Sequence, residues 1–102
     1  MREVSLRGRR MDYRVWKTEL KITDYQEVVA PVGCKFLTVQ VQNRVPCLWF
    51  LCDPARPEQI YRIRMVGTGR RIDEPFLRYI ATFQYMGGEL VFHVFEDFGE
   101  VE

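Results

Sequence analysis

The chain has 102 residues, with 15 Lys and Arg against 14 Asp and Glu, a formal net charge of +1, and 47% hydrophobic residues. This length suits one domain with its own core, and the composition excludes a disordered chain. No run approaches the roughly 18 apolar residues of a membrane-spanning helix, so a transmembrane protein is excluded. A single His excludes a multi-histidine metal site and leaves little room for histidine-based catalysis.

The two ends of the chain carry opposite charge. Residues 1–10 contain four arginines and one acid, whereas the last seven residues contain four acids and no base. We expect a flexible basic segment at 1–10, with a nucleic-acid-binding arm as the alternative, a single β domain at 11–96 and an acidic tail at 97–102. The near-neutral total argues against generic nucleic-acid binding, which normally requires a clear basic excess.

In the first half of the domain the hydrophobic period is two, which is typical of strands. Residues 13–22 form a predicted strand with a bulge near Thr18. Residues 24–28 allow a helical turn, but the following residues favour a second extended piece. Residues 35–42 alternate, with Leu37, Val39 and Val41 on one face. Asn43 and Arg44 then stand where a two-residue hairpin turn belongs.

The second half continues the pattern. Residues 45–52 are apolar on both faces, as in a strand covered on both sides. Residues 59–66 alternate, so that Arg62 and Arg64 project from the face opposite the apolar side chains. Residues 79–85 and 89–95 form the clearest hairpin, joined at 87–88. These elements predict an all-β fold: a compact antiparallel sandwich or half-open barrel of five to six strands, with hairpins at 43–44 and 87–88.

Cysteine and histidine give no sign of a catalytic or metal site. Cys34, Cys47 and Cys52 are odd in number and lack metal-type spacing, so we expect reduced structural thiols and no metal or other cofactor. His93 lies within a predicted strand, and no motif supplies a nucleophile or an orienting partner. A half-buried, hydrogen-bonded histidine is therefore expected, and the protein is predicted not to be an enzyme.

The stretch 67–71 (GTGRR) is the most suggestive part of the chain. It is not a P-loop, but glycines at a strand end can turn backbone N–H groups into an anion-binding nest, and arginines bind phosphate bidentately. An ordinary turn with solvated arginines is the alternative. The acids at 73 and 74 are expected to pair with these arginines rather than to bind a metal. The predicted ligand-binding residues are Arg62, Arg64, Gly67, Thr68, Gly69, Arg70 and Arg71.

Several segments together resemble a small family of uncharacterised phage and prophage proteins, a domain of unknown function. They are 22–24 (ITD), 37–43 (LTVQVQN), 45–49 (VPCLW), 52–54 (CDP), 66–69 (VGTG), 72–73 (ID), 79–84 (YIATFQ) and 90–96 (LVFHVFE). The resemblance implies that the domain starts near Met11. Family members commonly have Gly at the position of Arg44, so the turn type here is open. They commonly have His at the position of Arg70, and its replacement argues against a required catalytic His there.

The resemblance implies an accessory protein in the host bacterial cytoplasm. With the arginine-flanked loop, it predicts a non-enzymatic binding protein, a counter-defence factor that sequesters a phosphate-bearing nucleotide signal. One alternative is an inhibitor that binds a host enzyme; another is a phage structural or assembly component. The open edges of an antiparallel domain predict a homo-oligomer. The expected partners are a nucleotide or other small anion, or a host protein, and not a membrane.

Overall fold

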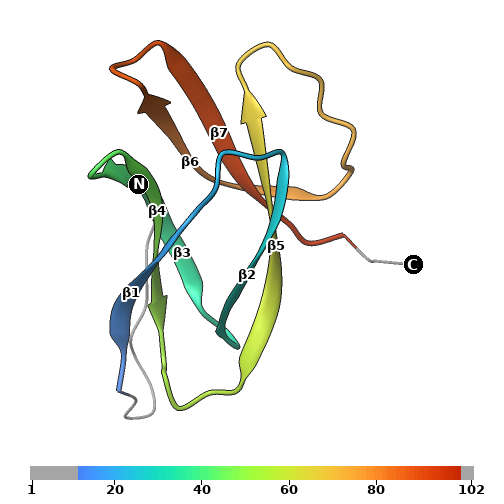
Figure 1. Cartoon of the computed structure of the whole chain (residues 1–102). Coiled ribbons are helices and arrows are strands. Elements are labelled where there is room, and N and C mark those ends of the chain that lie inside the picture. Colours follow the sequence, from blue (N-terminus) through green and yellow to red (C-terminus); the bar gives the residue numbers. More distant parts are fainter. Residues whose placement is uncertain (1–11, 100–102) are drawn as a thin grey trace.

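The computed structural model describes residues 12–99, which form seven strands and no helix (Figure 1). None of the described elements is therefore a helix able to cross a membrane. The strands are β1 Arg14–Glu19, β2 Tyr25–Pro31, β3 Lys35–Gln42, β4 Val45–Cys52, β5 Glu58–Gly67, β6 Leu77–Tyr85 and β7 Leu90–Asp97. The predicted segment 1–10 and residues 100–102 of the predicted tail lie outside the described residues, whereas Asp97 ends β7.

The strands form two antiparallel sheets, a three-stranded one in the order β1-β4-β3 and a four-stranded one in the order β2-β5-β7-β6. The predicted sandwich is confirmed, and the two sheets do not join into a closed barrel (Figure 1). The count of five to six strands is wrong by at least one. Tyr25–Pro31 is a full strand paired along its length with β5, so the extended piece favoured by the sequence is confirmed and the alternative, a helical turn at 24–28, is absent.

Both predicted hairpin turns are present. The β3–β4 turn consists of Asn43 and Arg44, which both have positive φ, 52° and 68°, as a two-residue hairpin turn of this hand requires. The β6–β7 connection contains the predicted glycines 87 and 88, but Met86 and Glu89 also belong to it, because the last strand pair is Tyr85 with Leu90.

β3 shows where simple alternation fails. The pairing of β3 with β4 shifts between Phe36 and Thr38, so Leu37 is an extra residue in the ladder. Phe36 and Val39 are consequently both buried, although strict alternation places them on opposite faces. The bulge predicted near Thr18 is not there, since β1 pairs with β4 in unbroken register.

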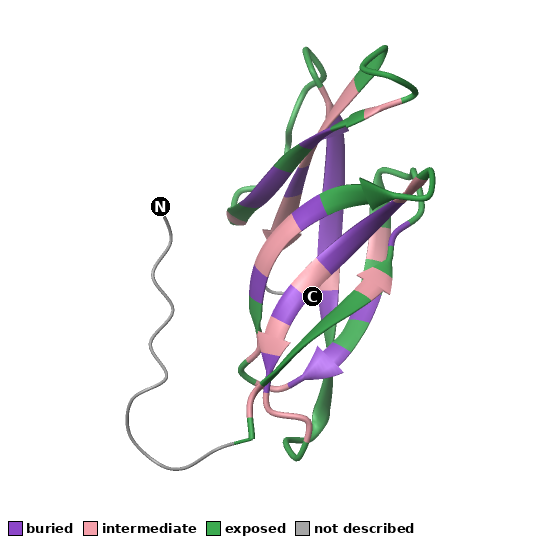
Figure 2. Ribbon diagram, turned by 90° about the vertical axis from the view of Figure 1, so that its left-hand side faces the viewer, coloured by how far each residue is buried: buried purple, intermediate pink, exposed green. Residues whose placement is uncertain are grey.

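The core lies between the two sheets. Leu48 of β4 and Val94 of β7 are 0% exposed, and the rings of Phe36 and Tyr61 meet edge to face at 5.2 Å between centroids. Figure 2 shows the buried positions as bands along these strands. The Tyr61 hydroxyl donates a hydrogen bond to the Pro31 carbonyl at 3.0 Å, and burial raises the pKa of Tyr61 to about 12.

One connection in the four-stranded sheet differs from the hairpins. β5 and β6 each run antiparallel to β7, so they are parallel to one another with β7 between them. Residues 68–76 must therefore return from the end of β5 to the start of β6 near the other end of the sheet (Figure 1). This crossover loop, residues 68–76, holds most of the predicted ligand-binding stretch and positions it over the neighbouring strands.

Candidate functional site

The crossover loop begins with a tight turn at the end of β5. The Arg70 N–H donates to the Gly67 carbonyl at 3.1 Å, and Gly69 has φ +87°, a conformation that glycine adopts without steric cost. The Thr68 N–H donates to the Val91 carbonyl at 3.3 Å. The amides of Thr68 and Arg70 are therefore already bonded within the fold, so they are not free to form the predicted anion-binding nest.

Arg64 is held inside the protein. Its side chain is 9% exposed, its Nε donates to Glu74 Oε1 at 2.8 Å, and its guanidinium lies 4.6 Å from the centroid of the Tyr25 ring. The hydrogen bond from Arg64 lowers the pKa of the Glu74 carboxyl, and the Tyr25 hydroxyl also donates to Glu74, at 2.8 Å. Arg64 thus fastens the crossover loop to β2 and β5, and its charge is largely neutralised.

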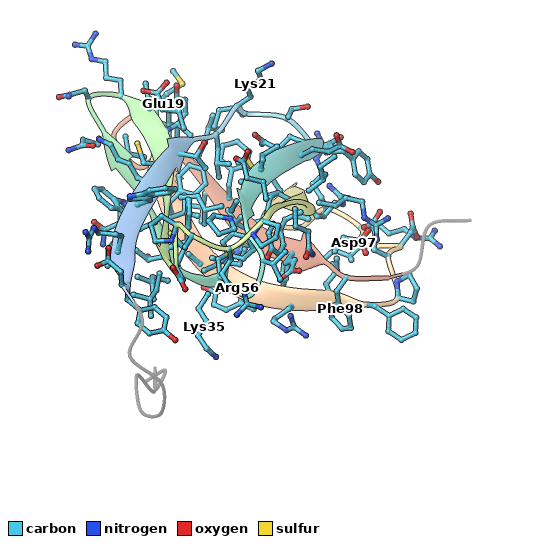
Figure 3. All side chains as sticks on the ribbon, turned by 90° about the horizontal axis from the view of Figure 1, so that it is seen from below. Glu19, Lys21, Lys35, Arg56, Asp97 and Phe98 are labelled. Atoms are coloured by element: carbon cyan, nitrogen blue, oxygen red, sulfur yellow. The ribbon has the colours of Figure 1, made fainter. Side chains whose placement is uncertain are left out.

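Arg62 is separated from the other predicted residues. Its guanidinium lies 3.8 Å from the Asp97 carboxylate and donates to the Gly99 carbonyl. Asp97 and Phe98 lie together where β7 ends (Figure 3). The structure therefore gives Arg62 a role in securing the end of β7, away from the loop at 67–71.

Arg70 and Arg71 face solvent beside a pocket of about 380 Å³. Arg71 Nε lies 2.7 Å from Asp73 Oδ1, with both side chains exposed. Within residues 12–99, no carboxylate lies within ion-pair distance of the Arg70 guanidinium. The residues that line this pocket, which we call the arginine pocket, are Asp24, Arg64, Val66, Gly67, Arg70, Arg71 and Phe92.

Four of the seven predicted ligand-binding residues thus share the arginine pocket, namely Arg64, Gly67, Arg70 and Arg71. Arg62, Thr68 and Gly69 do not line it. Asp24, Val66 and Phe92 line it without having been predicted. Phe92 lines it because β7 pairs with β5 and so places Phe92 opposite Gly67, a non-local pairing that no local pattern in the sequence marks.

His93 is half-buried and hydrogen-bonded, as predicted. Its Nε2 lies 2.7 Å from the Thr68 hydroxyl and its Nδ1 lies 2.9 Å from the Thr82 hydroxyl, which in turn lies 2.8 Å from the Tyr79 hydroxyl. Thr82 could have been found by counting back from the hairpin turn, whereas the contact with Thr68 depends on the crossover. The chain of hydroxyls satisfies both ring nitrogens and joins the loop to β6 and β7.

The three thiols are separate from this region. All are unpaired, with Cys34 half-buried and Cys47 and Cys52 buried. Burial raises the pKa of the Cys34 and Cys52 thiols, which disfavours the reactive thiolate. Among the described residues, no three His, Cys, Asp or Glu side chains are grouped so that they could hold a metal ion.

Comparison with protein families finds one match that covers most of the chain. Residues 11–101 match the family described as a domain of unknown function (DUF7352). The chain belongs to this family. Comparison with curated proteins and with solved structures finds no match. Membership therefore agrees with the predicted resemblance to a domain of unknown function.

Proposed function

We propose that this member of the family is a non-enzymatic binding protein that takes a phosphate-bearing nucleotide in the arginine pocket. The observation that supports this most directly is the Arg70 guanidinium, which borders the pocket with no carboxylate beside it in residues 12–99. The pocket volume of about 380 Å³ lies within the usual range for small-molecule sites. Arginine is well suited to phosphate because its planar fork donates two parallel hydrogen bonds.

The lining suggests a role for each group. Arg70 would bind the phosphate together with Arg71, whose exposed ion pair with Asp73 is worth little and is easily exchanged for a ligand. Phe92, which is half-buried, offers apolar surface to a base. Asp24, whose carboxylate is 81% exposed, can accept a hydrogen bond from an amino or hydroxyl group. Arg64 serves the fold rather than the ligand.

The biological role follows from the resemblance to phage and prophage proteins. A phage protein that binds a nucleotide without converting it removes that nucleotide from solution, so we infer a counter-defence factor acting in the host bacterial cytoplasm. The predicted homo-oligomer would carry one such site in each subunit. Within residues 12–99, no strand pairs with the outer edge of β1 or of β2, so both edges are available for such an assembly.

A protein-binding inhibitor is the second candidate, and exposed aromatic side chains favour it. Phe76, Tyr79 and Phe98 are each about half exposed, at 54%, 53% and 46%. Aromatic residues of this kind are enriched in protein interfaces. Recovery of one stoichiometric protein from a host lysate, without any nucleotide binding, is the result expected of such an inhibitor.

Isothermal titration of the purified protein with cyclic and linear nucleotides tests the first proposal. We expect saturable binding, and at least a tenfold weaker affinity for the variant Arg70→Ala with Arg71→Ala, because each charge-assisted hydrogen bond contributes about 1.5–3 kcal/mol. Arg56→Ala is the matched control, since Arg56 is an exposed arginine in the β4–β5 connection, at the opposite end of the sandwich (Figures 1 and 3).

The control should bind as the unaltered protein does. Equal affinity of the double variant, or no binding of any nucleotide by the unaltered protein, would rule the proposal out. Light scattering on the same samples measures the mass of the particle. A monomer at all concentrations would contradict the predicted homo-oligomer.

A further inference from the structure

The tips of the two tight hairpins border a second pocket. The β3–β4 turn lies on one side of it and the β6–β7 turn on the other, and the two hairpins lie on the same side of the molecule in Figure 1. The volume of this pocket is about 420 Å³, and it shares no lining residue with the arginine pocket. The lining of this hairpin pocket consists of Val41, Arg44, Gln84, Tyr85, Met86 and Gly87.

The lining combines apolar surface with a few polar groups, as small-ligand sites usually do. Val41 and Met86 are exposed and apolar. Arg44 supplies one guanidinium, and within residues 12–99 no carboxylate lies within ion-pair distance of it. Gln84 adds an amide, which can both donate and accept a hydrogen bond. Among the residues that the structure describes, no other cationic side chain lines the pocket.

The single cation decides which anion fits. One guanidinium matches one carboxylate, which it binds through two parallel hydrogen bonds. A phosphate dianion would leave a negative charge uncompensated here, because Arg44 has no cationic neighbour in the lining. The Gln84 amide is complementary to a peptide group, which also has one donor and one acceptor.

The backbone at both tips is strained, and this is a second observation on the same pocket. Asn43, Arg44 and Met86 are the non-glycine residues with positive φ in residues 12–99, and all three lie at these two turns. Asn tolerates this conformation, but Arg and Met do so at a cost that Gly avoids. Strained residues of this kind often mark sites where the side chain is needed for function.

We propose that the hairpin pocket binds a protein segment that presents a carboxylate next to an aliphatic side chain. The carboxylate pairs with the Arg44 guanidinium, the aliphatic group packs against Val41 and Met86, and the adjoining peptide group bonds to Gln84. The hairpin pocket is separate from the arginine pocket, because the two share no lining residue.

N-acetyl-leucine is a minimal probe of this chemistry, and its titration can be followed by amide chemical shifts in NMR. We expect saturable shifts at both hairpin tips. N-acetyl-leucinamide has the same shape without the charge, and its dissociation constant should be at least tenfold higher. Arg44→Gly should weaken N-acetyl-leucine binding to the same extent, whereas Arg56→Gly, on a distant loop, should leave it unchanged.

Octanoate separates a peptide ligand from a simple fatty acid, because it carries a carboxylate and an aliphatic chain but no peptide group. It should bind more weakly than N-acetyl-leucine. The proposal is overturned by tighter binding of octanoate, by equal binding of N-acetyl-leucinamide, or by full retention of binding in Arg44→Gly. Absence of shifts at the hairpin tips up to the solubility limit overturns it as well.

Discussion

For Arg64, the sequence predicted the face of the strand from which the side chain projects but not the residues that cover it. It alternates out of β5 as predicted, away from the core side chains. It is nevertheless buried, because Glu74 and the Tyr25 ring cover it. A buried guanidinium must keep its hydrogen bonds and its counter-charge, since an unpaired charge away from water is costly. Arg64 is therefore paired within the fold, whereas Arg70 and Arg71 face solvent beside the arginine pocket.

Glu74→Gln is expected to lower the free energy of unfolding at pH 7 by about 2 kcal/mol, because it removes the charge that compensates Arg64. Urea unfolding followed by tryptophan fluorescence measures this change. Asp73→Asn is the matched control: it breaks the exposed ion pair with Arg71, so its effect should stay within about 0.5 kcal/mol. Equal effects of the two substitutions would contradict the structural role of Arg64.

The same pair predicts a pH dependence. The pKa of Glu74 is lower in the folded protein than in the unfolded chain, chiefly through its hydrogen bond from Arg64. The stabilisation is therefore present above the ordinary carboxyl pKa and is lost as the pH falls through the lowered one. The difference in stability between the unaltered protein and Glu74→Gln should accordingly shrink between pH 7 and pH 3.

At the scale of elements, each hairpin turn depends on residues adjacent in the chain, whereas the crossover loop depends on pairing between distant segments. The β3–β4 turn needs only two residues able to adopt positive φ, so Asn43 and Arg44 reveal it in the sequence. The crossover loop depends on which strand β6 joins, and that choice is made by β7 lying between β5 and β6. The two pockets reflect this difference, since one lies between local turns and the other beside the crossover.

Arg44→Gly is expected to raise the free energy of unfolding by about 0.5–1 kcal/mol, because glycine adopts positive φ without the clash that a side chain meets. Arg56→Gly should do the opposite and lower it by a similar amount, since Arg56 has no positive φ and glycine makes the unfolded chain more flexible. Thermal and urea unfolding of both variants give the two signs. A loss of stability in Arg44→Gly would refute strain at this turn.

At the scale of the whole molecule, stability comes from the surface that the two sheets bury against each other. Leu48 lies at the centre of β4, the middle strand of its sheet, and is completely buried. Val15 belongs to the edge strand β1 and is 57% exposed. Leu48 and Val15 are both aliphatic residues in strands, and they differ mainly in how deeply each is buried in the core.

Leu48→Ala is expected to lower the free energy of unfolding by about 3 kcal/mol, through lost burial and the cavity it leaves. Val15→Ala should change it by less than about 1 kcal/mol, because the side chain already meets solvent in the folded state. Chemical unfolding of the two variants under the same conditions makes the comparison. Similar losses would mean that the two sheets do not share the core described here.

Local patterns account for much of what could be predicted. The period of two identified β1, β3, β5, β6 and β7, an apolar run identified β4, and the predicted half-buried, hydrogen-bonded His93 was confirmed. The errors come from non-local pairing. The bulge at Leu37 exists because β4 pairs with Phe36 and Thr38 on either side of it, and nothing in β3 alone marks that position. β2 is a strand over its full length because it pairs with β5 along that length.

The sequence by itself determined the all-β class, the two turns and an arginine-rich stretch after β5, because each depends on residues adjacent in the chain. The tertiary structure alone decided which arginines are paired within the fold and which face solvent. Arg64 meets Glu74 only because the crossover loop folds back over β5, and Arg62 meets Asp97 only because β7 pairs with β5. Charge neutralisation depends on distances between strands, and those distances are set by register and topology rather than by spacing along the chain.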